Sequence, residues 1–393
     1  MVLLDICKFF CELLIVYYLW YVEAFGNSSI VYILFIFALL FFILFLFNNG
    51  GKMQLRKVPY IVRNNYLLLV YCSVFGLISS YDKSFMYSNI MKCLGLTTIS
   101  FIIFYVSSIK QSINWLLKVV YLSCIICCIH MLFFGYYYAA NRIVLSSINN
   151  PNMLGMILST GIFSVVYMFN RVNSRELVFN IVRITPLLYC TIMTGSRKAL
   201  LFSITIIIVY LIYVFIKTVN TKNAINKIVL LLIIIIIIAT VYYIYINYFV
   251  NTATYKRIQN VFNEVGDKER IKMYKEAIEI FKEHPLFGVG LNQFRFYSSL
   301  EAYSHSTYAE SLSCFGIIGS LIYFLPIVYT LVYLIKITKY KNSFKLVITC
   351  SLLVIEIVLG TTVIYFYDFV HYIILGIVGW VLDSNYEGIK YEH

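Results

Sequence analysis

Uninterrupted apolar runs of about 20 residues constrain this chain more than any other feature. One of them extends from Ile30 to Phe47 without a charged side chain. A run of this length can cross the hydrocarbon core of a bilayer as an α-helix, because a helix satisfies its own backbone hydrogen bonds. Only 12% of the residues are charged, about half the share in a typical soluble domain. The sequence therefore predicts an all-α integral membrane protein, and the continuous runs argue against a β-barrel.

About twelve such spans can be counted in the 393 residues, and we expect residues 1–393 to form a single polytopic membrane domain. No internal repeat or cleavable signal peptide is visible. The ten cysteines lie in or beside apolar segments, so no disulfide framework is expected. The predicted spans are about 9–24, 28–48, 59–80, 87–107, 113–136, 153–170, 177–194, 198–216, 227–249, 309–335, 345–366 and 367–382.

The net charge of +13 is spread over the short joints between the spans rather than over one basic face. Lys and Arg concentrate in alternate joints, as at Arg56, Lys57 and Arg63. Cytoplasmic loops carry this excess of positive charge. We therefore expect both termini in the cytoplasm, and we read the charge as membrane orientation and not as nucleic-acid binding.

The one long polar interval, residues 250–308, lies between the ninth and tenth spans and is expected to face outward. Asp267 can cap a helix that ends near Glu283, and Arg270 would lie beside its apolar stripe. His284-Pro285 ends this helix, and Gly288 and Gly290 allow a tight turn. The stripe predicted to pack consists of Ile271, Tyr274, Ala277, Ile278 and Phe281.

Two cations, Arg197 and Lys198, lie in an outward-facing joint after Thr194-Gly195-Ser196. Snorkelling at the interface explains them, and so does an anion clamp, because a guanidinium matches phosphate oxygens. Arg270 is likewise either a solvated helix charge or a second phosphate ligand.

His305 lies where the long loop re-enters the membrane, within Ser304-His305-Ser306-Thr307. A histidine there can polarise or deprotonate a hydroxyl near neutral pH. The structural alternative is a helix start, in which Ser306 caps the next span and Glu310 completes a capping box. The other four histidines, at positions 130, 284, 371 and 393, have no comparable cluster of hydroxyl side chains around them.

A weaker outward-facing group is Asn149-Asn150-Pro151-Asn152, which a turn with a helix cap also explains. No GxGxxG, P-loop or HExxH motif and no cluster of metal ligands is visible. A bound phosphate would thus depend on Arg and Lys, and neither a metal nor another cofactor is expected.

The chain resembles the O-antigen ligase and O-antigen polymerase (Wzy-like) superfamily of bacterial envelopes over roughly residues 140–380. One departure is Ser306, since the family often has Asn after the histidine. Four pieces are similar, in the family's order: Asn150-Pro151-Asn152; Thr194-Gly195-Ser196-Arg197; His284-Pro285-Leu286-Phe287-Gly288-Val289-Gly290-Leu291-Asn292; and Ser304-His305-Ser306-Thr307-Tyr308 followed by Phe315-Gly316-Ile317-Ile318-Gly319.

The resemblance implies a GT-C-like, metal-independent glycosyltransferase that acts outside the cytoplasmic membrane on a glycan linked to undecaprenyl diphosphate. Arg197 and Arg270 would stabilise the departing diphosphate, and His305 would orient or deprotonate the acceptor hydroxyl. Further contacts to the substrate would come from Lys198, Asn150, Asn152, Tyr274, Asn292, Ser306 and Glu310.

We expect a repeat-unit polymerase of O-antigen, capsule or exopolysaccharide, whose acceptor is another lipid-linked repeat unit. Its partners would be membrane lipids, a chain-length regulator and other polysaccharide-assembly proteins, and not nucleic acid. A ligase or protein O-glycosyltransferase of the same superfamily is the first alternative. A flippase or transporter of lipid-linked oligosaccharides is an alternative from another class.

Overall fold

The computed structural model describes residues 2–21, 29–48, 58–138, 142–145, 148, 150–169, 174–219, 255, 265–341 and 343–386. Eleven of the twelve predicted spans coincide with a helix, and the ninth, 227–249, lies outside the described residues. These helices are α1 (Val2–Tyr21), α2 (Ser29–Asn48), α3 (Tyr60–Ser79), α4 (Lys83–Ile109), α5 (Asn114–Phe134), α6 (Pro151–Met168), α7 (Ser174–Met193), α8 (Arg197–Val219), α13 (Thr307–Tyr340), α14 (Phe344–Leu359) and α15 (Phe369–Tyr386).

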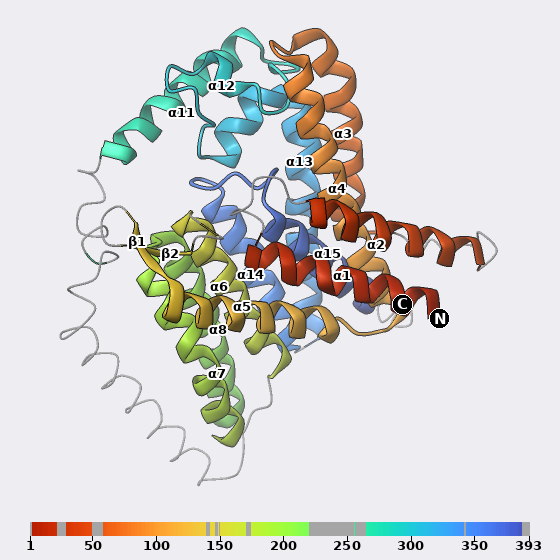
Figure 1. Cartoon of the computed structure of the whole chain (residues 1–393), viewed down its shortest axis with the longest axis vertical. Coiled ribbons are helices and arrows are strands. Elements are labelled where there is room, and N and C mark those ends of the chain that lie inside the picture. Colours follow the sequence, from red (N-terminus) through yellow and green to blue (C-terminus); the bar gives the residue numbers. More distant parts are fainter. Residues whose placement is uncertain are drawn as a thin grey trace. The chain divides into compact units, whose positions relative to one another are not determined.

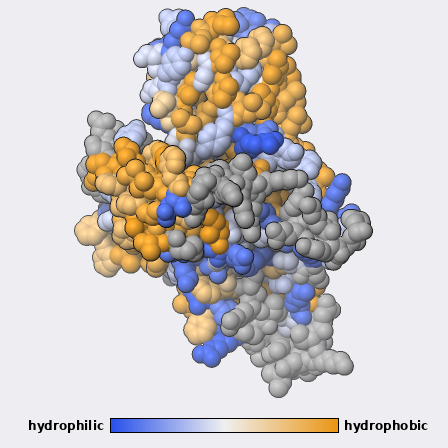
Figure 2. All heavy atoms as spheres, turned by 90° about the vertical axis from the view of Figure 1, so that its right-hand side faces the viewer, coloured by the Kyte–Doolittle hydropathy of each residue, from blue (hydrophilic) through white to orange (hydrophobic). Residues whose placement is uncertain are grey.

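Eight helices of the described chain, namely α2–α8 and α13, are long and apolar enough to cross a membrane. Their outer faces are apolar as well, as at Val70, Val74 and Ile78 of α3, which are all exposed. Figure 2 shows large hydrophobic areas on one face of the molecule. Since exposed apolar helix faces suit lipid and not water, the predicted all-α polytopic membrane protein is confirmed.

A short antiparallel hairpin was not predicted. Strand β1 (Tyr136–Tyr138) pairs with β2 (Arg142–Val144), with Tyr137 opposite Ile143. The hairpin falls in the joint between α5 and α6, and each strand has only three residues, fewer than the four to eight over which alternation signals a strand in a sequence.

The elements form two groups of packed helices (Figure 1). The first contains α3, α4, α13, α14, α15 and the end of α2, together with α11 (Val265–Glu283) and α12 (Phe294–Tyr297). Within this group α15 packs on α4, and α13 packs on α3, α11 and α14. The second contains α5–α8, the hairpin, most of α1 and the start of α2, and α6 is its centre, packed on α5, α7 and α8.

Helix α13 is interrupted at Gly316, whose φ of 61° and ψ of −166° are not helical. The segment 285–290 lies along this break and supplies backbone partners that the helix lacks there. Val289 N donates to Ser313 O at 3.0 Å and Gly290 N to Cys314 O at 2.8 Å, while Ile317 N donates to Pro285 O at 2.8 Å. The segment 285–290, which follows α11, is therefore fixed to residues 313–317 in the interior of a candidate membrane span.

Glycine is required on both sides of this contact. A Cβ at Gly316 would meet the backbone of Leu286, and one at Gly288 would meet the backbone of Cys314. Gly288 and Gly290 have positive φ angles of 67° and 101°, so the predicted tight turn is confirmed. The two backbones approach this closely only because neither glycine has a side chain.

Helix α11 ends at Glu283 as predicted, but it begins at Val265, before the predicted cap at Asp267. The apolar stripe was expected to lie against the membrane surface or the tops of the spans, and only part of it packs on another helix. Ile271 and Ile278 are about half exposed, whereas Ala277 is buried together with Met273 and Ile280. Contact with α13 selects this second face, on which the small side chain of Ala277 allows a close approach.

Candidate functional site

The turn before α13 holds His305 in a rigid backbone frame. Ser306 is the N-cap of α13, and its Oγ accepts from Ala309 N at 3.4 Å. The buried Ser304 donates its backbone N–H to Glu310 Oε2 at 2.9 Å, and its Oγ to Ser306 O at 3.0 Å. Glu310 thus accepts from Ser304, two positions before the N-cap. In a capping box the carboxylate would accept from the N–H of the N-cap residue itself, so the predicted capping box is not formed.

His305 itself has a φ of 58°, in the left-handed region. Its half-buried ring packs against Tyr303, with the ring centroids 4.4 Å apart. Few residues other than glycine adopt this conformation, although histidine does so more often than most. Such strain persists only where the surroundings enforce it, and it clusters at functional sites.

The loop between α14 and α15 anchors this turn. Thr307 donates its backbone N–H to Gly360 O and Val363 O, each at 2.8 Å, and its Oγ1 to Val363 O at 2.6 Å. Ser306 Oγ donates to Gly360 O at 3.3 Å. In return, Tyr365 N donates to Thr307 Oγ1 at 3.2 Å. Two chain segments more than 50 residues apart are therefore fixed to each other directly beside His305.

The same loop binds α11. Tyr274 Oη donates to Thr361 O at 2.8 Å. Arg270 lies one helical turn before Tyr274 and is half-buried, so the two side chains share one face of α11. The structure thus brings Tyr274, Ser306 and the neighbouring Glu310 to one end of the α13–α14–α15 group, as Figure 1 shows for their helices.

A second contact ties α11 to the segment after α12. Glu276 accepts from Ser298 Oγ at 2.7 Å and from Ser299 Oγ at 2.5 Å. Burial raises the pKa of Glu276, but the hydroxyl groups that donate to the carboxylate, with Lys272 nearby, bring the pKa below its ordinary value. The carboxylate form therefore holds this contact together.

Asn292 occupies a left-handed position, with a φ of 59°. Its Nδ2 donates to Asn89 Oδ1 at 3.0 Å, and its buried Oδ1 has no hydrogen-bond partner among the described residues. The neighbouring Gln293 is fully buried and pairs with Asp82 in both directions, accepting from Asp82 N at 2.8 Å and donating to Asp82 O at 3.0 Å. These amides attach the start of α12 to the start of α4.

Sequence reasoning missed Arg295, on α12. Its guanidinium lies 5.0 Å from the centroid of the Phe85 ring and interacts electrostatically with Glu310. Its buried Nε has no hydrogen-bond partner in the described part of the chain. The only signal in the sequence was its place three residues after the Gly288–Asn292 motif.

The other predicted residues belong to the second group of helices. Arg197 and Lys198 are the first two residues of α8, after Gly195 with its φ of 66°. Asn150 is the N-cap of α6, and its side chain accepts from Asn152 N at 3.0 Å. The helix cap that the sequence offered as a purely structural explanation of this group is therefore present.

A cation that was not singled out in the sequence organises this group. Arg142 Nη2 donates to Asn152 Oδ1 at 2.9 Å, and its Nε donates to Thr194 O at 2.8 Å. Arg142 is nearly buried. It thus joins the Asn150–Asn152 turn to the turn that precedes Arg197.

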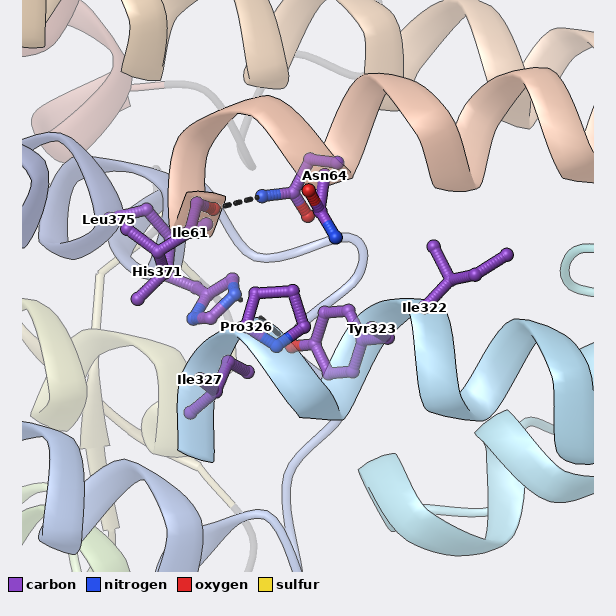
Figure 3. A pocket seen from close by; sticks show the side chains of 9 residues that line it. Ile61, Asn64, Ile322, Tyr323, Pro326, Ile327, His371 and Leu375 are labelled. Carbon is purple, nitrogen blue, oxygen red and sulfur yellow. Dashed lines mark hydrogen bonds between the residues drawn. The ribbon is translucent and has the colours of Figure 1, made fainter. Parts of the chain in front are cut away.

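Three side chains outside the predicted site form a buried hydrogen-bonded chain. His371 Nδ1 lies 3.1 Å from Glu356 Oε1, and its Nε2 lies 3.1 Å from Tyr323 Oη. Figure 3 shows the rings of Tyr323 and His371 pointing toward each other from α13 and α15. No sequence pattern groups them, because each lies in a different predicted span. Nowhere among the described residues are three His, Cys, Asp or Glu side chains placed to hold a metal ion.

Comparisons with known proteins give one family match. Residues 184–324 match the family model described as O-antigen ligase. Every predicted site residue except Asn150 and Asn152 falls within this range. No curated protein matches the chain.

One solved structure is similar over 85% of this chain and 98% of its own. It is described as "Structural coordination of polymerization and crosslinking by a peptidoglycan synthase complex". The identity is 12% and the TM-score 0.44, too low for an argument. The family match supports the predicted resemblance to the O-antigen ligase superfamily over residues 184–324.

Proposed function

We propose that this membrane protein is a repeat-unit polymerase. It would transfer a glycan from undecaprenyl diphosphate to a hydroxyl of another lipid-linked repeat unit, on the outer face of the bacterial cytoplasmic membrane. The observation that supports this most is the frame around His305. The left-handed His305 lies between Ser306, the N-cap of α13, and Ser304, whose backbone N–H is bound by the buried Glu310. All of these residues fall within the family-matched range.

In the proposed reaction, the acceptor oxygen attacks the anomeric carbon, and the bond from that carbon to the diphosphate oxygen breaks. His305 takes up or orients the proton that the acceptor hydroxyl releases. The lipid diphosphate leaves with the bonding electrons. The transition state thus gains negative charge on the diphosphate, where fixed cations are most effective.

Arg270 is the cation best supported in the first group, because the Tyr274 hydrogen bond to Thr361 fixes its helix beside the His305 turn. Arg197 and Lys198 are proposed to bind the diphosphate as well, at the start of α8. Tyr274, Asn292, Ser306 and Glu310 act in this proposal mainly by positioning, since the hydrogen bonds described above hold the backbone. Asn150 and Asn152 are likewise proposed to act by positioning, Asn150 as the cap of α6 and Asn152 through its bond from Arg142, which joins their turn to the turn before Arg197.

Ligation is the second candidate, and the description of the matched family as O-antigen ligase favours it. The chemistry at the donor is unchanged, and only the acceptor differs. A flippase is less well supported. A flippase would expose cations along a path, whereas Arg183 of α7 pairs with Glu176 at 2.8 Å and Lys8 of α1 with Glu12 at 3.3 Å.

The test is the glycan profile of a deletion strain that carries the wild-type gene or a variant. Polymerase function predicts that deletion leaves single repeat units on lipid, and that neither His305→Ala nor Arg270→Ala restores long chains. Lys275→Ala, an exposed cation on the same helix, is the matched control and should restore them. Long chains that remain on the lipid carrier would indicate a ligase instead, and normal chains with His305→Ala would remove His305 from the reaction.

Orientation is tested separately with Glu279→Cys, on the exposed face of α11. The proposal places this residue outside the cytoplasmic membrane, together with the whole 250–308 loop, and both termini inside. A membrane-impermeant maleimide should therefore label the variant in intact cells. Labelling only after the cells are opened would contradict both the orientation and the external reaction.

A further inference from the structure

A pocket in the first group lies directly beneath the turn that holds His305. Its volume is about 220 Å³, which is somewhat below the range of about 300–1,000 Å³ usual for ligand pockets. Thr307 and Gly360, which join the turn to the α14–α15 loop, both line it.

One end of the pocket is polar and buried. Glu356, His371 and Tyr323, the hydrogen-bonded chain described above, line this end together with Tyr365. The ring of Tyr365 stacks on that of His371, with the centroids 4.9 Å apart and the planes 20° from parallel. Tyr365 is only 5% exposed, and its hydroxyl has no hydrogen-bond partner within the described chain. A buried hydroxyl without a partner is unfavourable, so this group points to a polar ligand.

The hydrogen-bonded chain separates this pocket from a smaller one. Tyr323, Ile327 and His371 line both, and the smaller pocket also contains Asn64 (Figure 3). With space on both sides of them, the tyrosine and histidine are held by their hydrogen bonds to each other and to Glu356 and by the stacking of Tyr365 on His371. These contacts are present without a ligand, so the polar end is formed in advance.

The rest of the pocket is apolar and opens toward lipid. Its walls include Phe324, Ile327 and Ile357. Val328, also in the lining, is 50% exposed on the surface of α13, a candidate membrane span. An apolar chain can thus enter sideways from the bilayer.

The polar end lies close to the α14–α15 loop on two of its sides. Glu356 is three residues from the end of α14, and His371 is two residues from the start of α15. At 1.5 Å of rise per residue, both lie within about one turn of the loop, whereas Tyr323 reaches the polar end from the interior of α13.

The charge of the lining restricts the ligand. Among the residues that the structure describes, no Lys or Arg lines the pocket. The described lining therefore offers no fixed cation to a phosphate or diphosphate, which distinguishes this pocket from a site for the donor's diphosphate. The head that fits is uncharged and small, and it both donates and accepts hydrogen bonds.

We propose that this pocket binds a long-chain alcohol, with the hydroxyl at Tyr365 and the Glu356–His371–Tyr323 chain and the apolar tail leaving past Val328. The alcohol could be isoprenoid or straight-chain, since the site recognises an apolar tail with a terminal hydroxyl in either case. This binding is separate from the proposed glycosyl transfer and does not depend on it.

The test uses the full chain in lipid nanodiscs and a long-chain alcohol with a diazirine in its alkyl chain. After illumination, crosslinks are mapped by mass spectrometry. We expect them on peptides of α13 and α14 near Val328 and Ile357. Unlabelled farnesol and hexadecanol are the competitors that distinguish an isoprenoid from a straight-chain ligand, and competition by either supports the proposal. Farnesyl diphosphate and the hydrocarbon hexadecane should compete at least about fivefold less well, the factor of one lost hydrogen bond.

Two pairs of variants control for folding. Tyr365→Phe should weaken competition by the alcohol about fivefold. Tyr367→Phe is the control, since its hydroxyl is also buried and without a partner among the described residues. It should leave competition unchanged, because Tyr367 does not line the pocket. Val328→Phe should block the mouth and abolish the crosslinks. Val332→Phe, one turn further on the same exposed face, should leave them unchanged.

Three results would overturn the proposal. Equal competition by hexadecane would mean that the hydroxyl is not recognised. Stronger competition by farnesyl diphosphate than by farnesol would make the pocket an anion site. Crosslinks that persist unchanged in Val328→Phe would place the probe in the surrounding lipid and not in the pocket.

Discussion

Replacing Gly316 with alanine tests the contact on which the position of the whole 285–295 segment rests. Its φ of 61° and ψ of −166° lie in a region that only glycine occupies readily. A residue with a side chain is strained there by about 1–3 kcal/mol. The added Cβ would also meet the carbonyl group of Leu286 and lie 2.6 Å from Phe287 N, so the two backbones must separate.

Separation of the backbones would lengthen two hydrogen bonds at this point. Ile317 N donates to Pro285 O at 2.8 Å, and Ile318 N donates to Leu286 O at 3.3 Å. At about 0.5–1.5 kcal/mol for each bond, the total cost of Gly316→Ala is roughly 2–6 kcal/mol. For a chain of 393 residues, with an unfolding entropy of about 2.1 cal/mol/K per residue, that lowers the melting temperature by about 2–7 °C.

Gly95→Ala is the matched control. Gly95 lies in the interior of α4, and a Cβ there would meet nothing within 4 Å. Alanine favours a helix over glycine by about 1 kcal/mol, so this variant should melt at or slightly above the wild type. The measurement is thermal unfolding of the purified full chain in detergent, followed by size-exclusion chromatography of the heated samples.

The double variant Gly288→Ala, Gly316→Ala sharpens the test. Each glycine faces the backbone that contains the other. Once one Cβ has separated the two backbones, the second has less to displace, so the double variant should lose less stability than the two single losses added together. If Gly316→Ala melts like Gly95→Ala, or if the two losses simply add, the close backbone contact is wrong.

Three further predictions concern the frame around His305. Ser306→Ala removes the N-cap of α13 and should destabilise the chain by about 1 kcal/mol, measured as a melting shift against Ser351→Ala in the interior of α14; equal shifts would contradict the cap. Tyr274→Phe should cost about 0.5–1.5 kcal/mol through its lost bond to the α14–α15 loop, and the same assay should show no such loss for Tyr297→Phe. The depressed pKa of Glu276 means that its contribution is complete above the ordinary value of 4.5 and disappears as the pH falls through the lower, folded value. The protection of residues 298–300 against hydrogen exchange, relative to the intrinsic rate at each pH, should therefore fall below pH 4.5 in the wild type, whereas in Glu276→Gln it should be low at every pH.

The positions of the helices could be predicted because the information is local. A run such as Ile30–Phe47 is long enough to span a bilayer whatever its neighbours are, and His284-Pro285 ends α11 through backbone chemistry alone. The turn glycines Gly288 and Gly290 could be recognised for the same reason. The N-cap at Ser306 also depends only on residues that follow it directly.

Contacts between distant residues could not be predicted in this way. Gly316 lies inside an apolar run with no polar neighbour to signal a break in α13. The break becomes visible only when residues 285–290 are placed beside it. Likewise, Glu356 and His371 belong to different spans, and an isolated charge in a span indicates a partner without identifying it. The side of α11 that contacts α13 could not be identified from the stripe either, because the partner helix lies far away in the sequence.

The loop between α14 and α15 supports the candidate site through its backbone. The carbonyl groups of Gly360, Thr361 and Val363 accept the hydrogen bonds from Ser306, Thr307 and Tyr274. Every residue offers such a carbonyl group, so the amino acids of this loop can change without loss of these bonds. The position of His305 is then set by the path of a loop that has no recognisable motif, and this explains why the sequence identified the histidine but not the part of the chain that holds it.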